Sequence, residues 1–220
     1  MLASGPMDPF LAELDAQNAR ALDRIGVAAA REPSGDLSVA KLLTLALKNE
    51  LEATECAAMW IATTPEIDVK LALARQAGDE AKHFRLIADR LGELGVDTSS
   101  FEPGSRSALL QYMSTLETTV ERVAAGQFTR EALALVRNDE FMRFCESRDD
   151  AKTAALYRDV IQPDERHHHE LGRRLLGRLV GAQPDSRQRA LDAARKTLEL
   201  AEELQEIARL KMGVSRAPGC

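Results

Sequence analysis

The sequence predicts an all-α protein, and three observations support this fold class. Alanine, leucine, glutamate and arginine, all good helix formers, dominate the 220 residues, and aromatic residues make up only 4%. Apolar residues recur at helical spacing over long stretches. Glycine and proline gather in short segments between these stretches. The length suits one sizeable core, so we expect a single domain over residues 1–220.

Helical spacing divides the chain into six expected helices. They cover, approximately, residues 9–30, 37–63, 66–94, 107–147, 151–180 and 186–210. After a break at residues 31–35, Asp36 or Ser38 is suited to cap the second helix. Pro65 lies in a short turn before the third helix, which makes the second and third helices antiparallel neighbours. A break near Gly126 interrupts the fourth helix, and the chain beyond about residue 210 is expected to be mobile.

Charge and cysteine content narrow the classes of protein. The net charge of −6 argues against nucleic acid as the main partner, because phosphate binding favours a basic face. Cys56, Cys145 and Cys220 are far apart and odd in number, which indicates reduced thiols in a cytoplasmic protein. No Cys-x-x-Cys pair encodes a zinc knuckle or a rubredoxin-type iron site. We expect neither a membrane span nor a signal peptide, and residues 1–6 are either native or an added segment.

Two short motifs carry all four histidines of the chain. Glu80 and His83 are three residues apart, so they share one face of a helix. Glu80 also interrupts an apolar stripe, where an uncompensated charge would be costly. Glu165 and His168 repeat the same spacing on a second stripe. Both motifs therefore place a carboxylate and an imidazole toward the expected core.

A glutamate precedes each motif by about thirty residues, on the helix before it. With the turn near Pro65, the residue level with Glu80 in an antiparallel hairpin is Glu50. In the second hairpin the nearest carboxylate on the stripe is Glu131. Glu121 also falls on that stripe, but it would lie roughly 15 Å farther along the helix axis at about 1.5 Å per residue.

Six residues thus form a candidate site for two metal ions: Glu50, Glu80, His83, Glu131, Glu165 and His168. Four carboxylates in one core would repel each other strongly, and two divalent cations would cancel their charges. Carboxylate oxygens with one histidine per metal suit iron or manganese rather than the thiolate-seeking metals.

This pattern resembles the ferritin-like di-iron carboxylate superfamily. The resemblance covers residues 37 to 180 and implies an antiparallel four-helix bundle, with the helices at 9–30 and 186–210 as additions. It also implies that Glu80 and Glu165 bridge two iron ions, with manganese or a mixed iron–manganese pair left open. Glu50 and His83 would hold one metal, and Glu131 and His168 would hold the other.

Several neighbouring residues stay open as alternatives. His167 or His169 could replace His168, which is preferred because it repeats the spacing of the first motif. Asp79 and Asp164 could accept hydrogen bonds from metal-bound histidines, or they could be exposed acids beside the motifs.

Other polar and aromatic residues are expected to be structural. Glu52 and Asp139 are expected at the surface, and so is Glu55, although it could be an additional ligand. Cys56 and Cys145 are expected to be buried structural thiols. Core packing is expected for Trp60, Tyr112 and Tyr157.

The superfamily contains several functions, and the fold does not choose among them. The first expectation is an oxidoreductase in which a di-iron centre activates O₂ to oxidise or hydroxylate a small organic substrate, with electrons from an external donor. The short turn at Pro65 and the surroundings of Phe84 also loosely resemble tRNA-modifying hydroxylases of the superfamily. A tRNA substrate therefore stays open, although the acidic balance fits it poorly.

Three alternatives stay beside this expectation. One is a ferroxidase or other iron-handling protein. The second is a rubrerythrin-like, peroxide-reducing protein, which would need a separate electron donor because the Cys-x-x-Cys pairs are missing. The third is a metal-free helical interaction protein. A homodimer is compatible with all of these functions.

Overall fold

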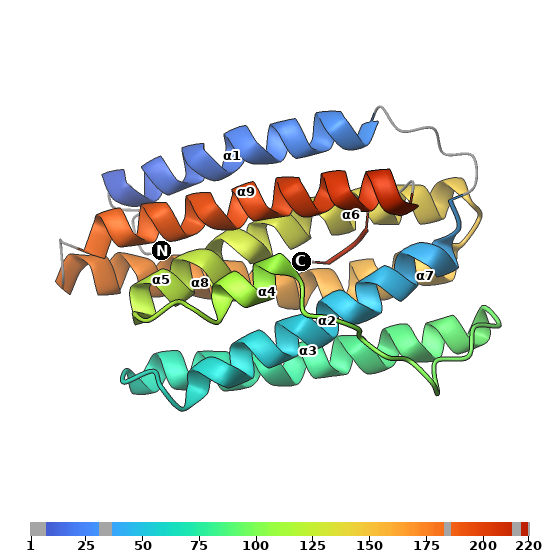
Figure 1. Ribbon diagram of the computed structural model, residues 1–220, viewed down its shortest axis with the longest axis horizontal. Coiled ribbons are helices and arrows are strands. Elements are labelled where there is room, and N and C mark those ends of the chain that lie inside the picture. Colours follow the sequence, from blue (N-terminus) through green and yellow to red (C-terminus); the bar gives the residue numbers. More distant parts are fainter. Residues whose placement is uncertain (1–7, 31–36, 183–185, 213–216, 220) are drawn as a thin grey trace, which may run out of the picture.

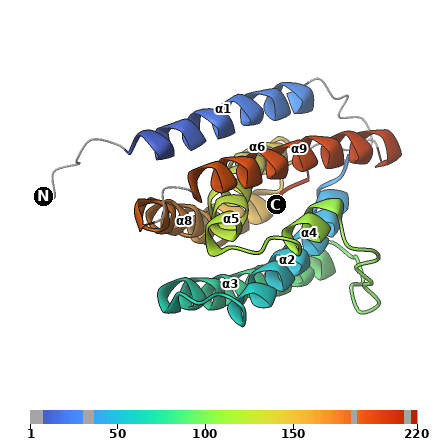
Figure 2. The same cartoon turned by 60° about the vertical axis from the view of Figure 1, so that its left-hand side comes forward.

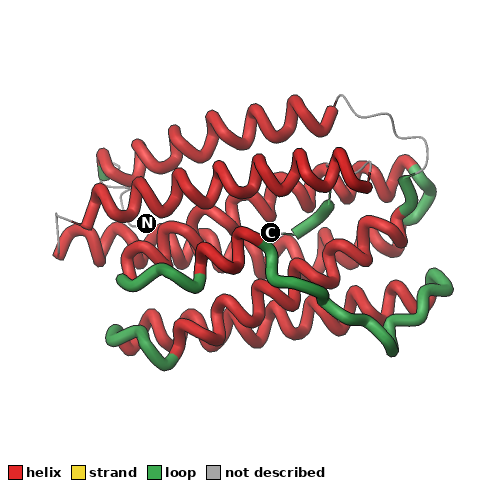
Figure 3. The backbone as a smooth tube through the Cα atoms, in the orientation of Figure 1, coloured by secondary structure: helices red, strands yellow, loops and turns green. Residues whose placement is uncertain are grey.

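The computed structural model describes residues 8–30, 37–182, 186–212 and 217–219, and every regular element within them is a helix. Its elements are α1 (Pro9–Ala30), α2 (Val39–Ile61), α3 (Ile67–Glu93), α4 (Ala108–Met113), α5 (Thr119–Val123), η1 (Ala124–Arg130), α6 (Glu131–Ser147), α7 (Ala151–Leu156), η2 (Tyr157–Ile161), α8 (Gln162–Ala182) and α9 (Ser186–Met212). The predicted all-α class is confirmed. Figure 3 shows loops joining the helices, with a long one between α3 and α4.

Two helical hairpins form the centre of the molecule. The first pairs α2 with α3, and the second pairs the continuous run α5–η1–α6 with the run α7–η2–α8. Figures 1 and 2 show the α2–α3 hairpin on one side of the second hairpin and α9 on the other, with α1 lying outside α9. No helix of the described residues combines the length and apolar character that a membrane crossing requires.

Two groups of buried apolar side chains lie along these hairpins. One group contains Trp60, Leu73 and Phe128, and the other contains Leu43 and Ile87. On α2 and on α3, a buried glutamate lies in the sequence between members of the two groups. The hairpins therefore bury a polar layer between two apolar layers.

The start of α2 agrees with the sequence-based prediction, but the helices of the second hairpin are less continuous than predicted. Ser38 caps α2 and its Oγ accepts a hydrogen bond from the Lys41 amide at 3.1 Å. Asp36, the other candidate cap, lies outside the described residues, as do residues 1–6. The expected helix over residues 107–147 is divided by a loop at residues 114–118 and by the π-helix η1. A second π-helix, η2, interrupts the helix expected over residues 151–180.

Two glycines allow elements to approach closely around η1. A Cβ atom on Gly126 would lie 2.9 Å from the Trp60 ring, and one on Gly172 would lie 2.7 Å from the carbonyl carbon of Gln127. No other residue type fits at these contacts without displacing its neighbour. The break expected near Gly126 is therefore a widened turn that packs against α2 and α8.

The last described residues, 217–219, pack against the rest of the molecule, which corrects the expectation of mobility for this segment, whereas residues 213–216 and 220 lie outside the described residues. Pro218 and Gly219 are both buried. The Pro218 carbonyl accepts a hydrogen bond from Asn49 Nδ2 at 2.9 Å, and the Gly219 amide donates to Asn138 Oδ1 at 2.8 Å. Figures 1 and 2 place this segment in the middle of the molecule.

Candidate metal centre

Four helices bring all six predicted ligands together in the polar layer. Each of these side chains is at most 2% exposed. Their donor atoms form two groups, within each of which the atoms lie within 4.8 Å of one another. The groups are Glu50, Glu80, His83 and Glu165, and Glu80, Glu131, Glu165 and His168. Glu80 and Glu165 belong to both groups, as bridging residues would.

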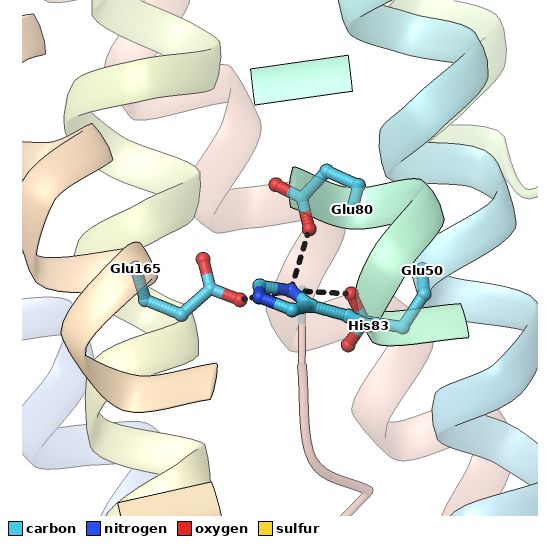
Figure 4. A group of neighbouring side chains, drawn as sticks. All are labelled: Glu50, Glu80, His83 and Glu165. Carbon is cyan, nitrogen blue, oxygen red and sulfur yellow. Dashed lines mark ion pairs between the residues drawn. The ribbon is translucent and has the colours of Figure 1, made fainter. Parts of the chain in front are cut away.

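His83 marks the first group. Its Nδ1 lies 3.5 Å from Glu50 Oε2, 3.3 Å from Glu80 Oε2 and 3.7 Å from Glu165 Oε1. Figure 4 shows the three carboxylates converging on the imidazole ring, with Glu165 approaching from the second hairpin. One nitrogen of His83 therefore faces three carboxylates at once.

His168 occupies the equivalent position in the second group. Its Nδ1 lies 3.5 Å from Glu80 Oε1 and 3.6 Å from Glu165 Oε2. The remaining carboxylate, Glu131, is the first residue of α6, directly after η1. Each hairpin thus contributes equivalent residues to the two groups, so the two groups are approximately symmetric.

Each histidine is held by the aspartate that precedes the glutamate of the opposite motif. His83 Nε2 lies 3.2 Å from Asp164 Oδ2, and His168 Nε2 lies 3.1 Å from Asp79 Oδ2. Lys82 Nζ also contacts Asp164 Oδ2, at 2.6 Å. A carboxylate at Nε2 keeps a proton there, so Nδ1 is the ring nitrogen that could bind a metal once any proton on it is displaced. Of the two readings left open for these aspartates, the structure supports the hydrogen-bonding one.

Some of the donor atoms lack hydrogen bonds. Among the described residues, four buried atoms of the centre have no hydrogen-bond partner: His83 Nδ1, His168 Nδ1, Glu50 Oε1 and Glu165 Oε2. Leaving a buried polar atom unpaired costs about 1–3 kcal/mol. Cations between the carboxylates and the Nδ1 atoms would satisfy all four, so the residues fit a pair of metal ions.

Burial favours the protonated form of two of the carboxyl groups when no metal is bound. It raises the pKa of Glu50 to about 8, and burial together with Glu165 raises the pKa of Glu131 well above its usual range. Burial opposes ionisation of Glu165 as well, but the neighbouring Glu131 and His168 side chains lower its pKa to about 2. The metal-free centre therefore favours protons on Glu50 and Glu131 and a charge on Glu165.

The surroundings of both histidines favour the cationic ring in the metal-free centre. Burial favours the neutral ring of His83, but the neighbouring Glu50 and Glu80 side chains outweigh it and raise its pKa to about 12. Burial also opposes the charge on His168, and Asp79 is the main group that raises its pKa to about 10. Protons thus supply the positive charge that the carboxylates require, and metal binding would displace them.

Two residues of the centre were missed by the sequence-based reasoning. Gln76 Nε2 donates to Glu131 Oε1 at 2.6 Å and lies 3.4 Å from Glu80 Oε1. Gln76 is one turn before Glu80 on α3, and its place on that stripe was the available signal. Gly219 is the other, since a Cβ atom there would lie 3.2 Å from Glu50 Oε1.

The alternative histidines lie outside the centre. His167 Nε2 contacts Arg75 Nη1 at 2.8 Å near the surface, and His169 Nδ1 contacts the Phe128 carbonyl at 2.8 Å. His168 is therefore the histidine of the second motif that faces the carboxylates.

The alternative acids also lie elsewhere. Glu121 belongs to a capping box with Thr118 at the start of α5, and Glu55 pairs with Arg106 at 3.2 Å. Asp139 is exposed, as expected. The expectation for Glu52 was wrong, because this residue is only 8% exposed.

The remaining candidates are packed in the core. Burial raises the pKa of the Cys56 and Cys145 thiols to about 12, so both are neutral, as expected of structural thiols. Cys220 lies outside the described residues. Trp60 and Tyr157 are buried, and the Tyr157 ring packs edge-on against Phe141 at 4.8 Å.

Comparison with known proteins places the chain in one family. No curated protein and no solved structure matches it. A family model described as "Protein of unknown function (DUF455)" matches residues 17–218, which is nearly the whole chain. The protein with this buried glutamate and histidine centre therefore belongs to the DUF455 family.

Proposed function

We propose that the protein is a ferritin-like di-iron oxidoreductase that activates O₂ to oxidise an organic substrate. One observation carries the proposal: two groups of buried donors, drawn from four helices, share Glu80 and Glu165. Glu50 and His83 would complete one iron site, and Glu131 and His168 would complete the other. Carboxylate-rich sites with one imidazole per metal also accept manganese, so a manganese or mixed pair is the close alternative.

The residues around the donors prepare the centre for binding. Asp164 and Asp79 hold the protons on the Nε2 atoms of the histidines, so each Nδ1 can donate its lone pair. Glu50 and Glu131 release protons as metals bind, which leaves four carboxylates to balance two divalent ions. A reduced pair of iron ions would supply electrons for the reduction of O₂, and an external donor would restore them.

An apolar cavity favours an organic substrate over iron storage. A cavity of about 420 Å³ lies beside α2, and its wall includes Asn49, the residue before Glu50. Volumes of roughly 300–1,000 Å³ with mostly apolar walls are typical of small-molecule sites. A route for iron ions would instead be lined by carboxylates.

The test combines metal content with O₂ consumption. The metal-free protein is reconstituted anaerobically with Fe²⁺, desalted and exposed to O₂ while bound iron and dissolved oxygen are measured. We expect about two irons per chain, and rapid O₂ uptake that requires them. Less than about one iron per chain would refute the di-iron centre.

Matched variants identify the residues required for iron binding and O₂ uptake. Added Fe²⁺ distinguishes an oxidase of organic substrates from a ferroxidase. Glu80→Gln removes a shared donor, whereas Asp89→Asn alters an exposed carboxylate on the same helix. We expect the first variant to lose both irons and O₂ uptake, and the second to keep them. Continued turnover with Fe²⁺ as the only electron donor would replace the proposed function by that of a ferroxidase.

A further inference from the structure

The cavity beside α2 lies at the same height along this helix as the candidate metal centre. Its wall on α2 extends from Leu45 to Cys56, a rise of about 16 Å at 1.5 Å per residue. Glu50 lies near the middle of this span. Arg130, the residue before the ligand Glu131, also lines the cavity. The cavity and the candidate metal centre are therefore built on the same segments of α2 and η1–α6.

The buried C-terminal segment connects the two sites. Ala217 lines the cavity, and two residues later Gly219 packs against Glu50. The hydrogen bond from Asn49 to the Pro218 carbonyl holds the segment against α2. The centre and the cavity are thus joined on the Glu50 side by three residues that carry no large side chain.

The walls of the cavity combine a large apolar area with an excess of cations. Leucine, isoleucine, methionine and alanine side chains from α2, α4 and α9 form most of the surface. Three basic side chains, Lys48, Arg130 and Arg137, line it together with one acidic side chain, Glu52. The Glu52 carboxylate accepts hydrogen bonds from the amide and the hydroxyl group of Ser107. An apolar wall that includes guanidinium groups suits a ligand with an apolar body and one anionic group.

We infer that this cavity binds the organic substrate of the centre as an amphipathic carboxylate, with its anionic group held among Lys48, Arg130 and Arg137. The inference rests on the proposed function, because it assigns the substrate class of that centre. A monoanion fits better than a multiply charged phosphate ester, because Glu52 offsets one of the three positive charges on the wall. The apolar body would lie along the wall of α2, level with Glu50.

Binding to the metal-free protein tests the substrate class without any metal chemistry. Decanoate and decan-1-ol, which share one apolar chain, are titrated separately into the protein by isothermal titration calorimetry. We expect one decanoate per chain and an affinity for decan-1-ol at least about tenfold weaker, because a hydrogen-bonded ion pair is lost. Equal affinities, or no binding of decanoate, would overturn the inference.

Variants test the position of the ligand. Arg137→Leu removes a cation of the wall, and Arg143→Leu removes an exposed cation of the same helix. We expect the first variant to lower the affinity for decanoate about tenfold and to leave the affinity for decan-1-ol unchanged. The second variant should change neither affinity. Leu110→Trp should block both ligands by filling the cavity, with far-ultraviolet circular dichroism as the check that it folds. Unchanged decanoate binding in Arg137→Leu would contradict the assignment.

A final measurement links the cavity to the centre and separates the two proposals. Decanoate is added to the anaerobic Fe²⁺ protein, and the near-infrared circular dichroism of the iron sites is recorded. We expect the spectrum to change with the same affinity as in calorimetry. Decanoate binding with an unaltered spectrum would overturn the substrate assignment. Decanoate binding to a protein that takes up no iron would refute the proposed function and leave the carboxylate site standing.

Discussion

The Glu50 side and the Glu131 side of the centre offer the same donor atoms in different surroundings. Glu131 is held by Gln76 at 2.6 Å and starts a helix directly after the π-helix η1. Glu50 Oε1 has no hydrogen-bond partner among the described residues and faces the backbone of Gly219. One carboxylate is therefore held by a neighbouring amide, whereas the other has an oxygen that no hydrogen bond holds.

This asymmetry gives the two sides different expected roles. A carboxylate already held by a neighbour loses little freedom when it binds a metal, so the Glu131 side should bind its ion more tightly. The Glu50 side lies next to the cavity, and Glu50 Oε1 is not held by a hydrogen bond, so substrate and O₂ should approach there. The predictions below test this difference.

The largest effect is expected from removing one terminal carboxylate on each side. Glu50→Gln and Glu131→Gln should each bind about one iron per chain in place of two, because each variant keeps one group of donors. Burial raises the pKa of both carboxyl groups and so favours their neutral form, which the amide closely matches in shape and charge, so each variant should change the stability of the metal-free protein little. Anaerobic iron titration and thermal unfolding measure the two quantities. Loss of both irons in both variants would show that the sides are not separable.

The next effect concerns the aspartates that hold the histidines. Asp164→Asn should weaken iron binding on the His83 side, and Asp79→Asn should weaken it on the His168 side, by about 10–100-fold each. The amide keeps the shape of the group but loses its charge, so the histidine becomes a poorer ligand. Competition with a chelator measures both affinities. If either variant lowers the affinity for both ions equally, the contact between each aspartate and the histidine of the opposite motif does not control a single metal site.

A smaller effect should appear in the pH dependence of the metal-free protein. The pKa values of Glu50, at about 8, and of His168, at about 10, both lie above their unfolded values. The folded state therefore binds more protons, and its stability should fall as pH rises from about 5 to 9. Metal affinity should change in the opposite direction, because binding releases protons. Unfolding temperatures at pH 6 and 9, in chelator and in Fe²⁺, check both signs, and a metal-free protein that gains stability with pH would contradict them.

The smallest effect concerns Gly219, which has a φ of +78° and touches Glu50. Gly219→Ala should cost about 1 kcal/mol of strain and also weaken the iron on the Glu50 side. Gly104→Ala is the matched control, since its φ is +68° and no atom lies near the new methyl group. Chemical unfolding and iron titration compare the two variants. If both variants weaken iron binding equally, the contact between Gly219 and Glu50 has no specific role in it.

The clustering of the six candidate ligands could be predicted because helical spacing and hairpin length can be inferred from a sequence. The three-residue spacing puts each glutamate and histidine on one face, and the turn near Pro65 sets Glu50 level with Glu80. Both relations depend on local geometry. His168 could be preferred over its neighbours for the same reason.

The surroundings could not be predicted because they depend on contacts between distant segments. Nothing local distinguishes the π-turn at η1 from a simple break at Gly126, since Trp60 and α8 determine it. The burial of Gly219 depends on Asn49 and Asn138, which lie far away in the sequence. Glu52 is likewise buried by Ser107, from a loop that has no periodic pattern.

The central claim is tested most directly by a crystal structure of the protein grown with iron, with anomalous scattering measured at the iron absorption edge. We predict two anomalous peaks, one among Glu50, Glu80, His83 and Glu165 and one among Glu80, Glu131, Glu165 and His168. Edge measurements for manganese would identify a mixed pair. A crystal of iron-containing protein with no anomalous peak between these residues would contradict the proposed metal centre.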